Sequence, residues 1–181
     1  MLEAELTRLT LAAYYAAVDP GLWGQFHQRF TELVRADFVG IQVHEYDKRH
    51  SRFISSFGDA NGFKESYHRH YSARNLWRER GKRLFRAGEI ILNSQHTPLG
   101  VFLRSEFYND FLRPVGIRDG LAAVLFRDAN TATTFSVNWG KARDCFGEPE
   151  HRLTKELLPH LARAHAIQQR LETLSAGEVV L

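Results

Sequence analysis

Two stretches near the N-terminus carry apolar side chains at helical spacing. Their apolar positions lie close to one stripe of a helix: Leu2, Leu6, Leu9, Ala13 and Ala16 in the first stretch, and Trp23, Phe26, Phe30, Leu33 and Val34 in the second. Between them, Pro20 disfavours helix at Asp19, and Gly21 opens a turn. Residues 2–35 therefore predict a pair of amphipathic helices.

Alternation of apolar and polar positions predicts two β-hairpins farther along the chain. The predicted strands cover residues 37–47, 52–58, 120–127 and 131–139. Polar turns join the first two and the last two, and residues 88–93 form a short extended run between the hairpins. Hairpins imply an antiparallel sheet.

Helical spacing of aromatic side chains predicts two more helices, at residues 63–72 and 105–113, the second of which we expect Pro114 to end. The remaining residues between 73 and 100 show no regular period. The order of elements predicts an α+β fold in which an antiparallel β-sheet is flanked by helices, with long helices at both termini. Residues 1–174 are expected to form one domain, followed by a tail at 175–181.

The last predicted helix, residues 149–174, carries a nearly heptad stripe. Its positions are Leu153, Leu157, Leu161, Ala164, Gln168 and Leu171. The stripe fits a signalling and dimerisation helix, and it equally fits packing against the domain's own sheet. Pro159 lies inside the helix and is expected to kink it or restart it.

Composition narrows the function classes. The chain has 181 residues, a net charge of +3 and one cysteine, Cys145. The charge is too small for a dedicated nucleic-acid binder, and one cysteine allows no intrachain disulfide. The N-terminus lacks the basic region of a signal peptide, and no apolar run reaches the ~18–20 residues needed to cross a bilayer. We expect a cytoplasmic protein with no membrane association.

No motif predicts catalysis or metal binding. P-loop, dinucleotide-binding, nucleophile-elbow and zinc-protease patterns are missing from the sequence. His68 and His70 would diverge on a helix, and Cys145 is interpreted as a structural or exposed cysteine rather than an activated thiolate. The run RERGKRLFR at residues 78–86 holds five basic residues and one acidic residue, and is interpreted as a solvated loop rather than an anion or nucleic-acid patch. We expect neither enzymatic activity nor a cofactor.

Aromatic side chains in the middle of the chain give the candidate ligand pocket. It comprises Tyr67, Tyr71, Trp77, Phe107, Tyr108 and Phe111 on helices, facing a sheet lined by Phe135, Val137 and Trp139. The same residues would also form a close-packed core. A cavity of about 300 Å³ or more between residues 105–113 and 131–139 would favour ligand binding, and a solid interior would favour an interaction module.

Four segments carry a family resemblance. They are YYAAVDPGLW (14–23), FGDANGFKESYHRHYSARNLW (57–77), SEFYNDFLRPVGIRDGLAAVLFRD (105–128) and LLPHLARAHAIQQRL (157–171). Together they resemble the N-terminal sensory region of a group of LuxR-type bacterial transcriptional regulators, over about residues 6–174. The chain departs from the pattern at Leu76, where a proline is expected, and in having no helix-turn-helix after residue 174.

The resemblance implies a PAS/GAF-like sensory domain that binds a small, partly apolar ligand and relays binding through its C-terminal helix. DNA would be contacted only through a helix-turn-helix domain that this chain lacks. Because helix-turn-helix proteins read paired half-sites, the resemblance also implies a homodimer. The alternative is a ligand-free interaction or dimerisation module.

Overall fold

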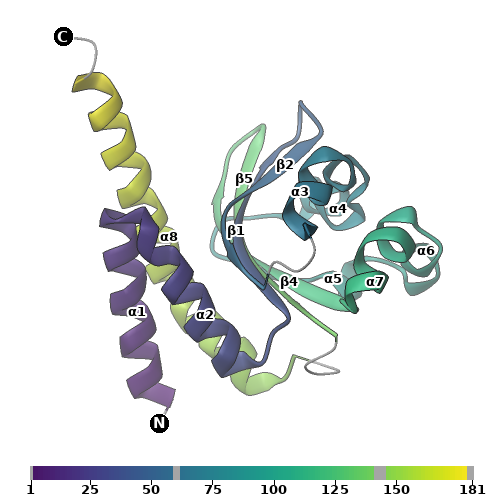
Figure 1. Cartoon of the computed structure of the whole chain (residues 1–181), viewed down its shortest axis with the longest axis horizontal. Coiled ribbons are helices and arrows are strands. Elements are labelled where there is room, and N and C mark those ends of the chain that lie inside the picture. Colours follow the sequence, from purple (N-terminus) through teal and green to yellow (C-terminus); the bar gives the residue numbers. More distant parts are fainter. Residues whose placement is uncertain (1, 59–61, 141–145, 179–181) are drawn as a thin grey trace.

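A computed structural model describes residues 2–58, 62–140 and 146–178 (Figure 1). Its centre is an antiparallel sheet with strand order β2-β1-β5-β4-β3. The strands are β1 (Phe38–Glu45), β2 (His50–Phe57), β3 (Ile90–Leu92), β4 (Asp119–Arg127) and β5 (Thr131–Trp139). The predicted α+β class, antiparallel sheet and two hairpins are confirmed.

The two hairpins join through the β1–β5 pair, in which Ile41 lies opposite Phe135. The turn of the second hairpin is stabilised by Asp128, whose side chain accepts hydrogen bonds from the backbone N–H groups of Asn130 and Thr131. Strand β5 is therefore central, with hydrogen-bonded neighbours on both sides.

The terminal helices cover one face of the sheet (Figure 1). They are α1 (Leu2–Val18), α2 (Trp23–Val34) and α8 (Glu148–Glu178), with a short 3₁₀ turn, η1 (Pro20–Leu22), between the first two. Their apolar stripes meet the sheet in the larger hydrophobic core, where Phe135 contacts the rings of Phe26 and Phe30. The predicted helical pair at residues 2–35 is confirmed.

The opposite face is covered by shorter helical segments (Figure 1). These are α3 (Phe63–Arg69), η2 (Tyr71–Arg74), α4 (Leu76–Leu84), α5 (Asn93–His96), α6 (Leu99–Leu103), η3 (Phe107–Leu112) and α7 (Arg113–Val115). Aromatic rings fill much of the space beneath them. Phe111 stacks on Phe63 and Tyr71, with ring centroids 4.3 and 4.7 Å apart.

The segment at residues 73–100, expected to be irregular, contains helices α4 and α5 and the beginning of α6. Helix α4 begins there because Asn75 acts as its N-cap and accepts hydrogen bonds from the backbone N–H groups of Trp77 and Arg78. The interpretation of residues 78–86 as a solvated loop is therefore wrong: most of the run is helical, and Arg78 is buried.

Two prolines also behave differently from expectation. The helix from Phe107 is π-helical as far as Leu112 and continues through Pro114 to Val115. Gly116, at φ 78°, ends the helix instead. Helix α8 likewise runs on through Pro159 without restarting.

The predicted dimerisation stripe packs mostly within its own chain. Leu157, Leu161 and Ala164 are buried in the core against α1, α2 and the sheet, and Gln168 is also buried. Only Leu171, 40% exposed, is available to another molecule. The structure thus favours packing within the domain for every position of the stripe except Leu171.

Candidate functional site

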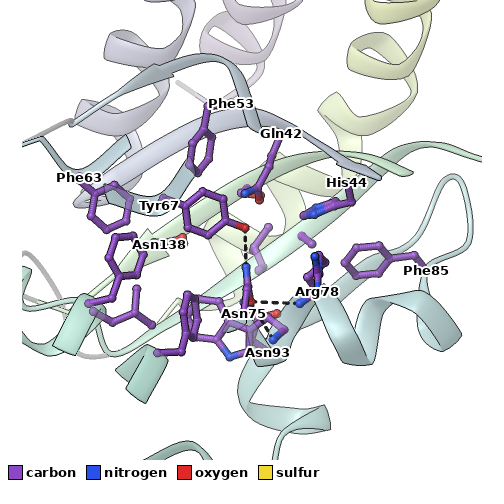
Figure 2. Close-up of a pocket in the computed structure, with 17 residues that line it drawn as sticks. Gln42, His44, Phe53, Phe63, Tyr67, Asn75, Arg78, Phe85, Asn93 and Asn138 are labelled. Atoms are coloured by element: carbon purple, nitrogen blue, oxygen red, sulfur yellow. Dashed lines mark hydrogen bonds between the residues drawn. The ribbon is translucent and has the colours of Figure 1, made fainter. Parts of the chain in front are cut away.

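A small cavity of about 40 Å³ lies between the sheet and the helices of the second face (Figure 2). We call it the inner cavity. Its apolar lining is Phe53, Phe63, Trp77, Phe85, Phe107, Phe111, Leu112, Leu121 and Ala122. Its polar lining is Gln42, His44, Tyr67, Asn75, Arg78, Asn93, Ser136 and Asn138. The mixture of rings with several convergent polar groups is typical of small-molecule sites.

Strand β5 contributes to the cavity through its even-numbered positions. Ser136 and Asn138 line it, whereas Phe135, Val137 and Trp139 lie in the core against the terminal helices. The prediction that these three apolar residues line the pocket is wrong. Successive side chains of a strand point to opposite faces of the sheet. The prediction therefore chose the face of β5 that packs against the terminal helices, whereas the cavity lies at the other face.

The predicted helical residues divide into two groups. Tyr67, Trp77, Phe107 and Phe111 line the inner cavity. Tyr71 and Tyr108 pack against the neighbouring aromatic cluster without lining the cavity. The sequence identified the cavity-lining group correctly, because aromatic residues at helical spacing marked the elements that cover the sheet.

Hydrogen bonds hold the polar lining in place. The Asn75 amide donates to the Tyr67 hydroxyl over 2.8 Å, while its oxygen caps α4 (Figure 2). His44 is hydrogen bonded at both ring nitrogens, to Ser51 at 2.9 Å and to Thr134 at 3.1 Å. Burial, together with the positive charges of Arg78 and Arg127, lowers the pKa of His44 to about 3, so its ring is uncharged at neutral pH.

The Arg78 side chain is 1% exposed. Its Nη2 is paired with the Glu79 carboxylate, but its Nε and Nη1 have no hydrogen-bond partner among the residues that the structure describes. The Gln42 amide nitrogen also lacks a partner within the described part of the chain. Sequence reasoning missed Arg78 because its neighbours are charged. The signal was present in Gly81 and Phe85, which follow it at helical spacing on a buried face.

A larger pocket of about 340 Å³ adjoins the inner cavity. We call it the outer pocket. It is lined by Trp77, Asn93, Ser94, Thr97, Leu99, Phe102, Arg118 and Asp119. Trp77 and Asn93 line both spaces, so these two side chains stand between them. Burial raises the pKa of Asp119, whose carboxylate accepts hydrogen bonds from the backbone N–H groups of Ser94 and Gly120.

The arrangement is suited to binding a small molecule. It offers one guanidinium, four amide side chains and two hydroxyl groups around a space walled by aromatic rings. Within residues 2–58, 62–140 and 146–178, no three histidine, cysteine or carboxylate side chains come together to hold a metal ion. Cys145, considered above as a thiolate, lies outside the described residues.

A scan against protein-family models finds no match, and a search of curated proteins finds none either. Solved structures do match. The ligand-binding (LBD) domain of VqsR from Pseudomonas aeruginosa has 14% sequence identity and a TM-score of 0.71, over 93% of this chain and 96% of that one.

Two further structures match with lower TM-scores. A GAF domain of a phosphoenolpyruvate-protein phosphotransferase from Acinetobacter has 14% identity and a TM-score of 0.56, covering 94% of this chain and 93% of that one. Escherichia coli SdiA has 15% identity and a TM-score of 0.54, over 82% of this chain and 59% of its own. The chain has a GAF-like fold. At these identities the likeness extends to the fold alone.

Among the described residues, no helix combines the length and the apolar character needed to span a bilayer.

Proposed function

We propose that this chain is the ligand-sensing domain of a LuxR-type transcriptional regulator that acts in the cytoplasm. The observation that carries the proposal is that β5 contacts the inner cavity with one face and the core of the terminal helices with the other. Ser136 and Asn138 line the inner cavity, while Phe135 and Val137, their immediate neighbours in sequence, pack in the core of the terminal helices. A ligand that shifts β5 therefore acts directly on the packing of α2 and α8.

The contacts on the far side of β5 give the relay its route. The Phe135 ring lies 4.9 Å from that of Phe30 and 5.8 Å from that of Phe26, both on α2. Leu157 and Leu161 of α8 belong to the same core. Since a close-packed core transmits displacement, small changes at the cavity reach α8 through these side chains.

Helix α8 supplies the output. Gln169 to Gly177 are all exposed, and the helix continues beyond the other terminal helices (Figure 1). A DNA-binding domain connected through this helix would receive its changes in position. Contact with DNA belongs to that domain, and the sensory domain itself performs no catalysis.

Homodimerisation is proposed through exposed apolar side chains of the terminal helices rather than through the buried stripe. Two series follow i, i+4, i+7 spacing: Leu11, Tyr15 and Val18 on α1, and Ile167, Leu171 and Leu174 on α8. Because α1 and α8 pack side by side, both series belong to one layer of the molecule (Figure 1).

The volumes bear on ligand size. A cavity of about 300 Å³ between residues 105–113 and 131–139 would have favoured ligand binding, and the inner cavity there, about 40 Å³, favours the interaction module instead. The outer pocket, about 340 Å³, reaches the size of a ligand site, although neither segment lines it. A ligand of metabolite size would thus occupy the outer pocket and reach inward past Trp77 and Asn93.

Native mass spectrometry of the purified domain tests the proposal, because it reports bound molecules and oligomeric state together. We expect a co-purified small molecule, and slower hydrogen exchange in α8 when that molecule is present. A domain that carries no ligand, and that a metabolite library never stabilises against heat, would instead support the ligand-free interaction module.

A further inference from the structure

The guanidinium of Arg78 is a buried charge that lines the inner cavity and is only partly compensated. A buried charge is costly unless it is paired and hydrogen bonded. Arg78 has one ion pair, with Glu79, whose own side chain is 49% exposed and lies outside the cavity lining. Two of the three guanidinium nitrogens have no partner among the described residues, and one of these is Nη1, at the end of the side chain.

Glu79 pairs with one end of the Arg78 guanidinium from outside the inner cavity, and no carboxylate is among the described residues that line the cavity itself. Among the described residues that line the inner cavity, Arg78 alone carries a charge at neutral pH. His44 is neutral, and burial raises the pKa of Tyr67, so its phenol stays protonated. The remaining polar lining consists of amides and a hydroxyl. The inner cavity is therefore electropositive.

We propose that the inner cavity binds the carboxylate of a small organic acid, with Arg78 as its counter-ion. The inference rests on the sensing function proposed above and adds the chemical class of the ligand. Nε and Nη1 of Arg78 supply charge-assisted donors, and the unpartnered amide nitrogen of Gln42 supplies a neutral one.

Size and charge favour a carboxylate over a phosphate. A space of about 40 Å³ admits a group of a few atoms, and the two nitrogens of Arg78 without a partner in the described residues, Nε and Nη1, match the two oxygens of a carboxylate. A phosphate is larger and carries up to two negative charges, which a guanidinium already paired with Glu79 and neutral donors around it would compensate less well than one.

The outer pocket is suited to the carbon skeleton of the acid. Trp77, Leu99 and Phe102 give it an apolar wall, on which the rings of Trp77 and Phe102 stack with centroids 5.4 Å apart. An acid with a planar or short acyl body would lie there, with its carboxylate passing between Trp77 and Asn93 to reach Arg78.

Pairs of isosteric compounds test the assignment on the unaltered chain. Isothermal titration and thermal shift would compare benzoate with benzamide, propionate with propionamide, and each acid with inorganic phosphate. We expect the acids to bind about tenfold or more tightly than the amides and to raise the melting temperature, since a hydrogen bond to a charged donor is lost with the amide. Phosphate should have no effect.

Two arginine variants on the same helix give a matched comparison. Arg78→Gln removes the buried guanidinium, whereas Arg80→Gln removes an exposed one. Binding of the acids should be lost in R78Q and unchanged in R80Q, with circular dichroism to verify folding. Should R78Q not fold, the isosteric pairs on the unaltered chain decide alone.

The outcomes separate this inference from the sensing function. Equal binding of acid and amide, binding that survives in folded R78Q, or stabilisation by neutral compounds alone overturns the carboxylate assignment and leaves sensing intact. If none of the acids binds and a crystal structure shows only water at Arg78, the carboxylate assignment is also overturned. The sensing function is then tested separately, by whether native mass spectrometry finds a small molecule that co-purifies with the domain.

Discussion

The indole Nε1 of Trp23 donates a hydrogen bond to Oε1 of Gln168 over 2.7 Å, and both side chains are buried. The bond connects the first residue of α2 to α8 at the last buried position before the exposed end of that helix. It therefore links the core through which the proposed relay passes to the exposed C-terminal part of α8.

Replacement of Gln168 by Leu should lower the free energy of unfolding by about 1–3 kcal/mol, because it leaves the buried indole N–H without an acceptor. Chemical denaturation measures the change. Gln169→Ala, at the exposed neighbouring position, should stay within about 0.5 kcal/mol. An equal loss in both variants would show that the buried hydrogen bond does not account for the effect.

Phe111→Ala should cost about 3–5 kcal/mol, the range for a close-packed aromatic residue. The expectation follows from the stacking of its ring on Phe63 and Tyr71 and from the small volume of the neighbouring cavity. Urea midpoints of this variant and of Phe126→Ala, whose ring is 44% exposed, make the comparison. A cost for Phe111→Ala no greater than that for Phe126→Ala would mean that the space beneath the ring is much larger.

Stability should fall as the pH is lowered from about 6.5 to 5. Burial lowers the pKa of His27 to about 3, and burial with two nearby arginines does the same for His44. Below the usual pKa of histidine, about 6.5, the unfolded chain binds protons that the folded chain excludes, so unfolding is favoured. Each histidine should remove about 2 kcal/mol by pH 5.

Denaturation curves across that pH range measure the slope. His27→Gln should reduce it by about 1.4 kcal/mol per pH unit, which corresponds to one proton. His96→Gln, at an exposed position, should leave it unchanged. A slope that both variants leave as it was would show that His27 is protonated in the folded state.

Replacing both Leu171 and Leu174 by Ser should convert a dimer to a folded monomer, because both side chains are exposed in the single chain and contribute little to its own core. Light scattering after gel filtration reports the mass. Leu99→Ser, at an exposed position on α6, serves as the control. The proposed dimer surface is wrong if the unaltered chain is monomeric throughout, or if the double variant remains a dimer.

Local patterns were sufficient for most of the fold. Alternation at residues 131–139 predicted β5 with the same ends that the structure shows, and the turn beginning at Asp128 predicted its hairpin. Such features depend on neighbouring residues alone, so a single sequence carries them. The helix α4 was missed because a run of charges obscured the N-cap Asn75 and the buried position of Gly81.

The sequence by itself determined the strands, the terminal helices, the α+β class and the aromatic helices that cover the cavity, because each depends on periodicity within a short segment. Only the tertiary structure decided that Ser136 rather than Phe135 faces the cavity, and that Leu157 packs within its own chain. Both faces of β5 are covered, so alternation cannot tell them apart. The burial of Arg78 likewise depends on β1 and β5, distant in sequence, which meet it across the cavity.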